Sequence, residues 1–100
     1  MTVLIGGTFR LPPEAVERFR PHMETMLAKS RAEDGCLTYS YAFDVLEPGL
    51  VRVFEAWRDQ AALDAHFATA HLAEWRAAGA EHGVSDRRLS IYEVAAERPL

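Results

Sequence analysis

A carboxylate, an indole and two imidazoles lie close together in the chain, between residues 55 and 71. Glu55 and Trp57 are two residues apart in a run that alternates as a β-strand does, so both side chains project from one face. His66 and His71 follow on a segment with helical spacing. A carboxylate beside an imidazole fixes its tautomer and helps it accept a proton, while an indole supplies a flat apolar wall. These residues are therefore candidates for general acid–base catalysis.

The same residues also have a purely structural interpretation. A carboxylate on the buried face of a strand must be hydrogen-bonded, and His66 on the returning helix is a suitable partner for Glu55. Such a pair would join helix to sheet without catalysis. His71 lies five residues beyond His66, so on an ideal helix their directions differ by more than a right angle. We therefore expect His71 at a bend or pocket rim, His22 and His82 on exposed surfaces, and no metal site.

Aromatic and basic residues supply weaker candidates. Tyr39 and Tyr41 alternate on one face of an earlier strand. Such aromatics pack in a core or a dimer interface, but a phenol that reaches a cavity can also orient a quinone or phenol substrate. Arg52, Arg87 and Arg88 are interpreted as charges at the rim of the molecule. Phosphate-binding glycine loops, serine-hydrolase turns and dinucleotide fingerprints are absent from the sequence, which argues against hydrolase or nucleotide-dependent chemistry.

Six elements must position these residues. Strands are predicted at residues 2–10, 36–44, 50–58 and 87–94, and helices at 13–32 and 59–83, the latter with a bend before His71. Pro21 predicts a kink or a break in the first helix. In the second strand, Leu37 and Tyr39 should share one face. The order strand, helix, strand, strand, helix, strand predicts a ferredoxin-like α+β fold, a four-stranded antiparallel sheet with both helices on one face.

Composition limits size, partners and compartment. A length of 100 residues, 49% of them apolar and 26% charged, predicts one domain over residues 1–100. The net charge is −4 and no basic run is present, so nucleic acid is not an expected partner. Cys36 is the one cysteine, and the apolar run at the start of the chain is short, so neither a disulfide, a signal peptide nor a membrane span is expected. We expect a cytoplasmic protein.

Both faces of the second and third predicted strands carry apolar or aromatic side chains, whereas the predicted helices cover one face. The other face would be an exposed apolar patch unless a second subunit covered it. The sequence therefore predicts a homodimer that packs sheet against sheet.

Several short motifs in this chain form a familiar set. They are GCLTY at residues 35–39, VFEAWRD at 53–59, Leu63, His66-Phe67 and His71. The set resembles the antibiotic biosynthesis monooxygenase domain family, which includes quinol monooxygenases, and the likeness covers nearly the whole chain. The resemblance implies a homodimeric α/β barrel of two ferredoxin-like subunits, each with a cavity between sheet and helices. Its known enzymes oxidise quinols or phenolic polyketides with O2 and need no metal, flavin or haem.

In such a reaction the anion of the substrate reduces oxygen, so the protein must deprotonate a phenol in a dry pocket. On this chain the resemblance implies that Trp57 is a wall, His66 a base or orienting group, and Glu55 its partner. The residues expected to line the substrate are Tyr39, Tyr41, Phe67 and His71.

The chain contains no Asn. It therefore departs from the haem-degrading branch, which uses an Asn on the first strand, and from the amide contact of the polyketide-oxidising members. The expected substrate is a quinol or another small polyphenol, and no cofactor is expected. Two other functions stay open on this fold: a non-redox isomerase or lyase that transfers a proton at the same histidine, and a dimeric protein that binds a small ligand without turnover.

Overall fold

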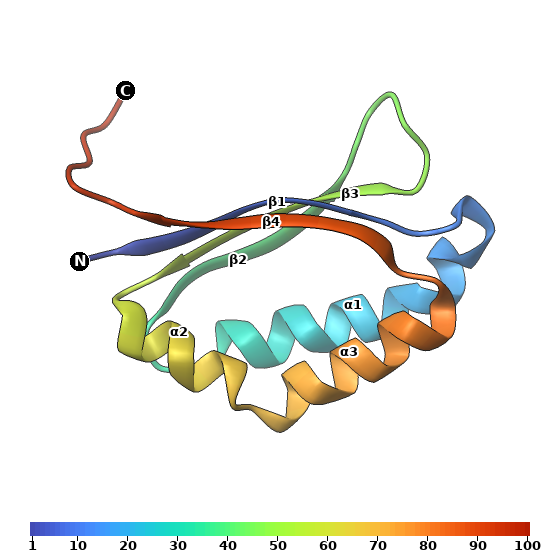
Figure 1. The fold of residues 1–100 in the computed structure, drawn as a ribbon, viewed down its shortest axis with the longest axis horizontal. Coiled ribbons are helices and arrows are strands. Elements are labelled where there is room, and N and C mark those ends of the chain that lie inside the picture. Colours follow the sequence, from blue (N-terminus) through green and yellow to red (C-terminus); the bar gives the residue numbers. More distant parts are fainter.

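Four antiparallel strands form one sheet, and the helices pack on one of its faces (Figure 1). The computed structural model describes residues 1–100. The strands are β1 (Val3–Arg10), β2 (Cys36–Phe43), β3 (Leu50–Trp57) and β4 (Ser85–Glu93), in the spatial order β2-β3-β1-β4. This is the ferredoxin-like α+β fold that the order of elements predicted. Strands β3 and β1 are therefore central, and β2 and β4 form the edges.

The first helical region is a short 3₁₀ turn, η1 (Pro13–Ala15), followed directly by α1 (Val16–Arg31). Pro21 lies inside α1, and the helix continues through it. The break that was one predicted outcome does not occur. Proline removes a single backbone hydrogen bond, here the one to Glu17, while Phe19 and the rest of the buried side of α1 stay packed in the core.

The second helical region is divided in two. Helix α2 (Gln60–Phe67) begins at Asp59, whose side chain accepts a hydrogen bond from a first-turn N–H at 2.8 Å, as its capping residue type predicts. Helix α3 (Ala70–His82) has a cap of its own: the Thr69 hydroxyl accepts from a first-turn N–H at 3.3 Å and donates to the His66 carbonyl at 2.7 Å. A side chain bonded in this way competes with helix continuation. The expected bend is therefore a complete break between two helices.

The pairing of β2 with β3 shifts near the start of β2. Cys36 pairs with Trp57, and the next pair begins at Thr38, so Leu37 is an extra residue. A bulge of this kind reverses the alternation of side chains locally. Leu37 is 58% exposed and Cys36 packs against the core. The prediction that Leu37 shares a face with Tyr39 is wrong for this reason.

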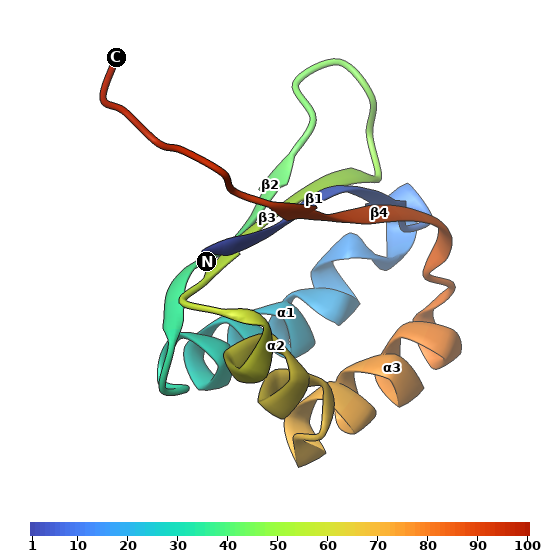
Figure 2. The same cartoon turned by 60° about the vertical axis from the view of Figure 1, so that its left-hand side comes forward.

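The two faces of the sheet differ in their cover. On the covered face, β1 and β3 pack against the helices in a core of 16 buried residues, in which Trp57 and Phe19 are fully buried. Figure 2 shows α1 under the β2 side of the sheet and α3 under the β4 side. On the open face, Leu37, Phe54 and Tyr92 are about half exposed. None of the helices combines the length and the apolar character needed to cross a membrane.

Candidate active site

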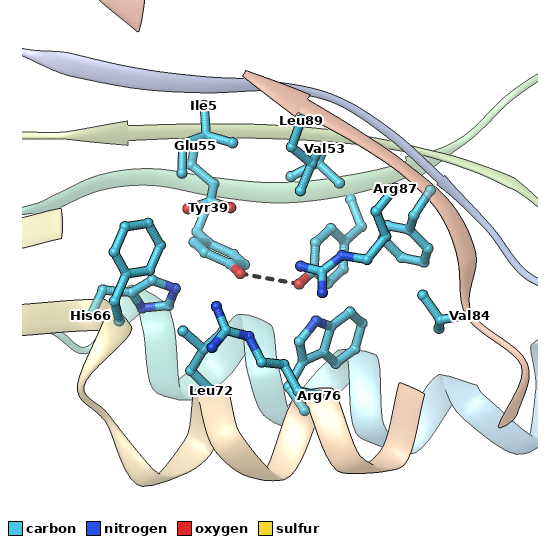
Figure 3. Close-up of a pocket in the computed structure, with 14 residues that line it drawn as sticks. Ile5, Tyr39, Val53, Glu55, His66, Leu72, Arg76, Val84, Arg87 and Leu89 are labelled. Carbon is cyan, nitrogen blue, oxygen red and sulfur yellow. Dashed lines mark hydrogen bonds between the residues drawn. The ribbon is translucent and has the colours of Figure 1, made fainter. Parts of the chain in front are cut away.

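A cavity of about 60 Å³ lies between the covered face of the sheet and α3 (Figure 3). Fourteen residues line it, and ten of them are apolar or aromatic. The other four are Glu55, His66, Arg76 and Arg87. Largely apolar walls with a few convergent polar groups are the usual form of a small-molecule site. In its present form the cavity has room for a few water molecules.

Two phenols meet on the sheet side of this cavity. Tyr39 and Tyr41 alternate on β2, so both face the helices, and their hydroxyl oxygens are 3.1 Å apart, within hydrogen-bonding distance. Burial raises the pKa of both phenols far above the ordinary value, and the nearby Glu55 carboxylate raises the pKa of Tyr39 further. The ring of Tyr41 also stacks on Trp75 at 5.3 Å between centroids. Both phenols are therefore neutral at physiological pH. Since one hydroxyl donates to the other, the accepting hydroxyl keeps its own proton for a hydrogen bond to an oxyanion.

Glu55 lies opposite Tyr39 in the sheet and is 5% exposed. Its Oε1 accepts a hydrogen bond from Trp57 Nε1 at 3.0 Å, so the prediction that these two side chains share a face is confirmed. Burial raises the pKa of Glu55 to about 7, against the opposing effect of the Trp57 hydrogen bond. A carboxyl group with this pKa exists in both protonation states near neutral pH. It can therefore give or accept a proton there.

His66 has a different partner from the one predicted. Its Nδ1 lies 2.6 Å from Oε2 of Glu33, a residue of the turn after α1, and no hydrogen bond joins it to Glu55. Burial lowers the pKa of His66, although the Glu33 carboxylate opposes this effect. A neutral imidazole that donates Nδ1–H to a carboxylate has its lone pair on Nε2. The prediction of a Glu55–His66 pair is wrong. The Glu55 carboxylate accepts its hydrogen bond from Trp57, and His66 is bonded to Glu33 instead.

The Nε2 atom of His66 is the free nitrogen of this ring. It makes no hydrogen bond within the chain. It is nevertheless not fully buried, because the one fully buried polar side-chain atom without a partner is Ser30 Oγ. Because His66 lines the cavity, its Nε2 is accessible from there. His66 thus offers a proton acceptor to a molecule bound in the cavity.

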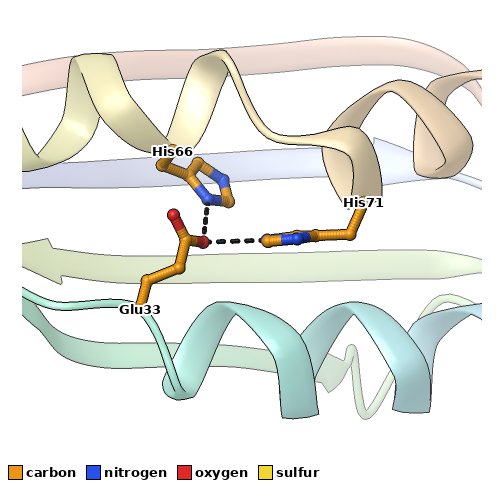
Figure 4. A group of neighbouring side chains, drawn as sticks. All are labelled: Glu33, His66 and His71. Carbon is orange, nitrogen blue, oxygen red and sulfur yellow. Dashed lines mark hydrogen bonds and ion pairs between the residues drawn. The ribbon is translucent and has the colours of Figure 1, made fainter.

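His71 joins the same carboxylate. Its Nε2 lies 2.9 Å from Oε2 of Glu33, so one oxygen accepts from two imidazoles (Figure 4). The prediction that His66 and His71 point apart assumed one continuous helix. The break at Thr69 instead turns both rings toward Glu33. We call Glu33, His66 and His71 the imidazole cluster.

The imidazole cluster also has the composition of a metal site. Three potential ligand atoms lie within 4.8 Å of one another, and two imidazoles with a carboxylate suit divalent transition metals. The expectation that the histidines bind no metal rested on their divergence, and that premise is wrong. In the structure two hydrogen bonds of 2.6 and 2.9 Å hold the three side chains together. A metal ion would have to replace both of these bonding protons.

The candidate residues are not all at the cavity surface. Trp57 is fully buried behind His66, with the two ring centroids 4.6 Å apart, and the aromatic wall is formed instead by Trp75. His71 lies behind His66 and does not line the cavity. The candidates that line it are Tyr39, Tyr41, Glu55, His66 and Phe67.

Sequence reasoning missed Glu33, Arg76 and Trp75, and it treated Arg87 as a surface charge. Glu33 is 33 residues from His66 along the chain, so no periodic pattern relates them. The available signal was its place immediately before the Asp34-Gly35 turn that ends the helical region. A carboxylate there can reach the helices that follow the hairpin.

The fold and the cavity together define a class: a ferredoxin-like α+β protein with a cavity between sheet and helices that is lined by a carboxyl group and an imidazole. Residues 2–78 match the family model described as antibiotic biosynthesis monooxygenase, and the chain belongs to this family. The resemblance noted in the sequence is thereby confirmed.

Related proteins and solved structures agree with this assignment. An uncharacterized Synechocystis protein, sll1783, is 31% identical over 98 residues, covering 98% of this chain and 67% of that protein. Rv0793 of Mycobacterium tuberculosis, which is named as a monooxygenase, is 32% identical to this chain. The match covers 75% of this chain and 73% of Rv0793. A Deinococcus radiodurans structure named for the same family superposes with a TM-score of 0.90 at 25% identity, covering 100% of this chain and 98% of that one. The family and these names support a monooxygenase-like function.

Proposed function

We propose that the protein is a cofactor-independent monooxygenase that oxidises a quinol or another small polyphenol with O2. The observation that carries this proposal is the state of His66. Its Nδ1 is held by Glu33, and its free Nε2 opens onto a cavity that also contains two neutral phenols and a carboxyl group with a pKa of about 7. These are the groups needed to deprotonate a phenol and to stabilise its anion.

The chemistry follows from these positions. His66 Nε2 accepts the proton of a substrate hydroxyl, and the Glu33 carboxylate stabilises the imidazolium through the Nδ1–H bond. Of Tyr39 and Tyr41, the hydroxyl that accepts their mutual hydrogen bond donates its own proton in a hydrogen bond to the phenolate. The electron-rich ring then reduces O2: a C–O bond forms, the O–O bond breaks, one oxygen atom stays on the ring and the other leaves as water. A hydroquinone becomes a hydroxyquinone, and the ring itself supplies all the electrons that O2 accepts. Glu55 can exchange the protons that this sequence requires.

Oxygen uptake with hydroquinone and 1,4-dihydroxynaphthalene tests the proposal, with the protein-free autoxidation rate subtracted. We expect His66→Gln to lower kcat by about 10²–10⁴, the usual contribution of a general base. His22→Gln, a change of the same kind at an exposed position on α1, should leave kcat unchanged. Equal rates for the wild type and His66→Gln would remove His66 from the mechanism.

Two other outcomes would replace the proposed reaction. Turnover of an added phenol at the same rate without oxygen would identify an isomerase or lyase that transfers protons at His66. A small molecule recovered from the purified protein, with no turnover of phenols or quinols, would identify a binding protein without catalysis.

We further propose that the protein acts as a cytoplasmic homodimer of single-domain subunits, joined through the open face of the sheet. The support is the half-exposed Leu37, Phe54 and Tyr92, beside a surface hollow of about 420 Å³ to which Leu37 and Phe54 contribute. Exposed apolar patches of this kind mark association surfaces. Analytical ultracentrifugation at micromolar concentration should give the dimer mass for the wild type and the monomer mass for Phe54→Asp. A wild-type monomer would contradict the proposal.

A further inference from the structure

Two arginines at the cavity lack any partner in the chain. Seven of the ten arginines donate to a carboxylate or to a backbone carbonyl. Arg76 and Arg87 do neither, although both line the cavity. Neighbouring Arg88, in contrast, donates to Asp86 at 2.8 Å. Arg76 and Arg87 are therefore the two arginines at the cavity whose guanidinium groups are free to bind a ligand.

The two side chains reach the cavity from opposite sides. Arg76 comes from α3 and Arg87 from β4, and Figure 3 shows both side chains extended among the residues that line the cavity. Both residues are exposed overall, so this side of the cavity is its mouth. Arg87 works against the effect of burial on the Tyr41 pKa, and Arg76 helps to lower the pKa of His66. Each guanidinium group is therefore within electrostatic reach of the interior.

The interior offers these arginines no anion of its own. Glu55, the acidic residue that lines the cavity, is bonded to Trp57 and makes no ion pair with either arginine. The remaining walls are apolar or aromatic apart from His66. Two guanidinium groups at an apolar pocket suit a planar anion that brings a ring with it, because the guanidinium fork matches a carboxylate in two parallel hydrogen bonds.

We propose that Arg76 and Arg87 form a carboxylate subsite at the cavity mouth, and that the substrate is an aromatic acid. Its ring occupies the cavity between the sheet and α3 with a hydroxyl toward His66 and the two tyrosines, and its carboxylate stays at the mouth, away from Glu55. The identity of the ring chemistry rests on the proposed function, whereas the anion subsite itself does not.

Binding of unreactive probes tests the subsite directly. 4-Hydroxybenzoate and 4-hydroxybenzamide have nearly the same shape and differ in charge. Calorimetry on the full chain should show the acid bound at least about tenfold more tightly, as a charge-assisted bidentate contact provides. Arg76→Met and Arg87→Met should each abolish most of this preference while changing amide binding less than about twofold. Arg88→Met is the matched control, because it removes the same charge from the next residue of β4, on the open face of the sheet.

Equal affinity for the acid and the amide would overturn the proposal, and so would an Arg88→Met variant that loses the preference as fully as Arg87→Met. Neither cavity arginine makes a hydrogen bond or an ion pair within the chain, so both variants should keep a thermal midpoint close to that of the wild type. Oxygen uptake with 2,5-dihydroxybenzoate and 2,5-dihydroxybenzamide separates this inference from the proposed function. Selective binding of the acid without oxidation of either compound refutes only the monooxygenase, whereas oxidation of both with equal kcat/KM refutes only the subsite.

Discussion

The imidazole cluster and the two arginines at the cavity mouth, Arg76 and Arg87, belong to the same cavity. They differ in how their polar groups are paired. In the cluster, one Glu33 oxygen accepts from two imidazoles, and His66 is almost completely buried. At the cavity mouth, Arg76 and Arg87 make no hydrogen bond or ion pair within the chain. Groups that the chain itself pairs are fixed before any ligand arrives, and groups left unpaired can respond to one. In the proposed mechanism the paired groups position the chemistry, and the unpaired arginines select the substrate.

The largest effect is expected from breaking the cluster. Glu33→Leu leaves two imidazole N–H groups without an acceptor in a mostly buried site. We expect a loss of about 2–5 kcal/mol in the free energy of unfolding, measured by urea denaturation at pH 7. Glu81→Leu, at an exposed position of α3 without a side-chain hydrogen bond or ion pair, should cost less than about 0.5 kcal/mol. If both variants lose the same amount, the cluster does not hold the helices to the turn.

A pH-dependent effect of similar size is expected at Glu55. Its folded pKa of about 7 lies above the ordinary value of 4.5, so the folded state holds a proton that the unfolded state has released between these pH values. The contribution of Glu55 to stability is therefore full below about pH 4.5 and is lost as the pH rises to about 7.

The Glu55→Gln variant isolates this contribution, since a glutamine resembles the protonated acid. Its stability relative to the wild type should rise by up to about 3 kcal/mol between pH 4.5 and pH 7.5 and stay constant above. Denaturation curves of both proteins at several pH values measure the difference. A difference that is independent of pH would show that Glu55 titrates normally and would remove it from the proton exchange.

A smaller effect, on both catalysis and stability, is expected from Tyr41→Phe. The change removes one hydroxyl from the cavity and a 3.1 Å contact with Tyr39. We expect kcat for quinol oxidation to fall about tenfold and stability to fall by about 0.5–1.5 kcal/mol. A loss of stability without any change in kcat would place Tyr41 in the packing of the core alone.

The smallest effect is expected from removing metal ions. Dialysis against a chelator should change the rate of oxygen uptake less than about twofold, because hydrogen bonds already hold the imidazole cluster together. Abolition of activity, with recovery on adding one divalent metal ion, would instead assign the cluster as a metal centre and exclude the mechanism through a free His66.

The sequence predicted the fold and the strand side of the site because both depend on short periodic patterns. Alternation alone placed Glu55 and Trp57 on one face, and Asp59 marked the start of α2. The helix side could not be predicted in the same way. A single hydroxyl, that of Thr69, changes one helix into two, and the contact of Glu33 with His66 joins distant parts of the chain without any period. The bulge at Leu37 likewise reflects pairing between strands and leaves no trace in alternation.

The unpaired state of Arg76 and Arg87 also bears on how such a protein evolves. Exchanging either residue removes no hydrogen bond or ion pair within the chain, so the cost in folding free energy is expected to be small. Replacing Glu33 or His66, in contrast, is expected to lower both the free energy of unfolding and the rate of the reaction. Selection can therefore alter the charge of the accepted substrate one codon at a time while the reaction itself is retained. Divergence among related proteins should accordingly be concentrated at positions 76 and 87 rather than at 33 and 66.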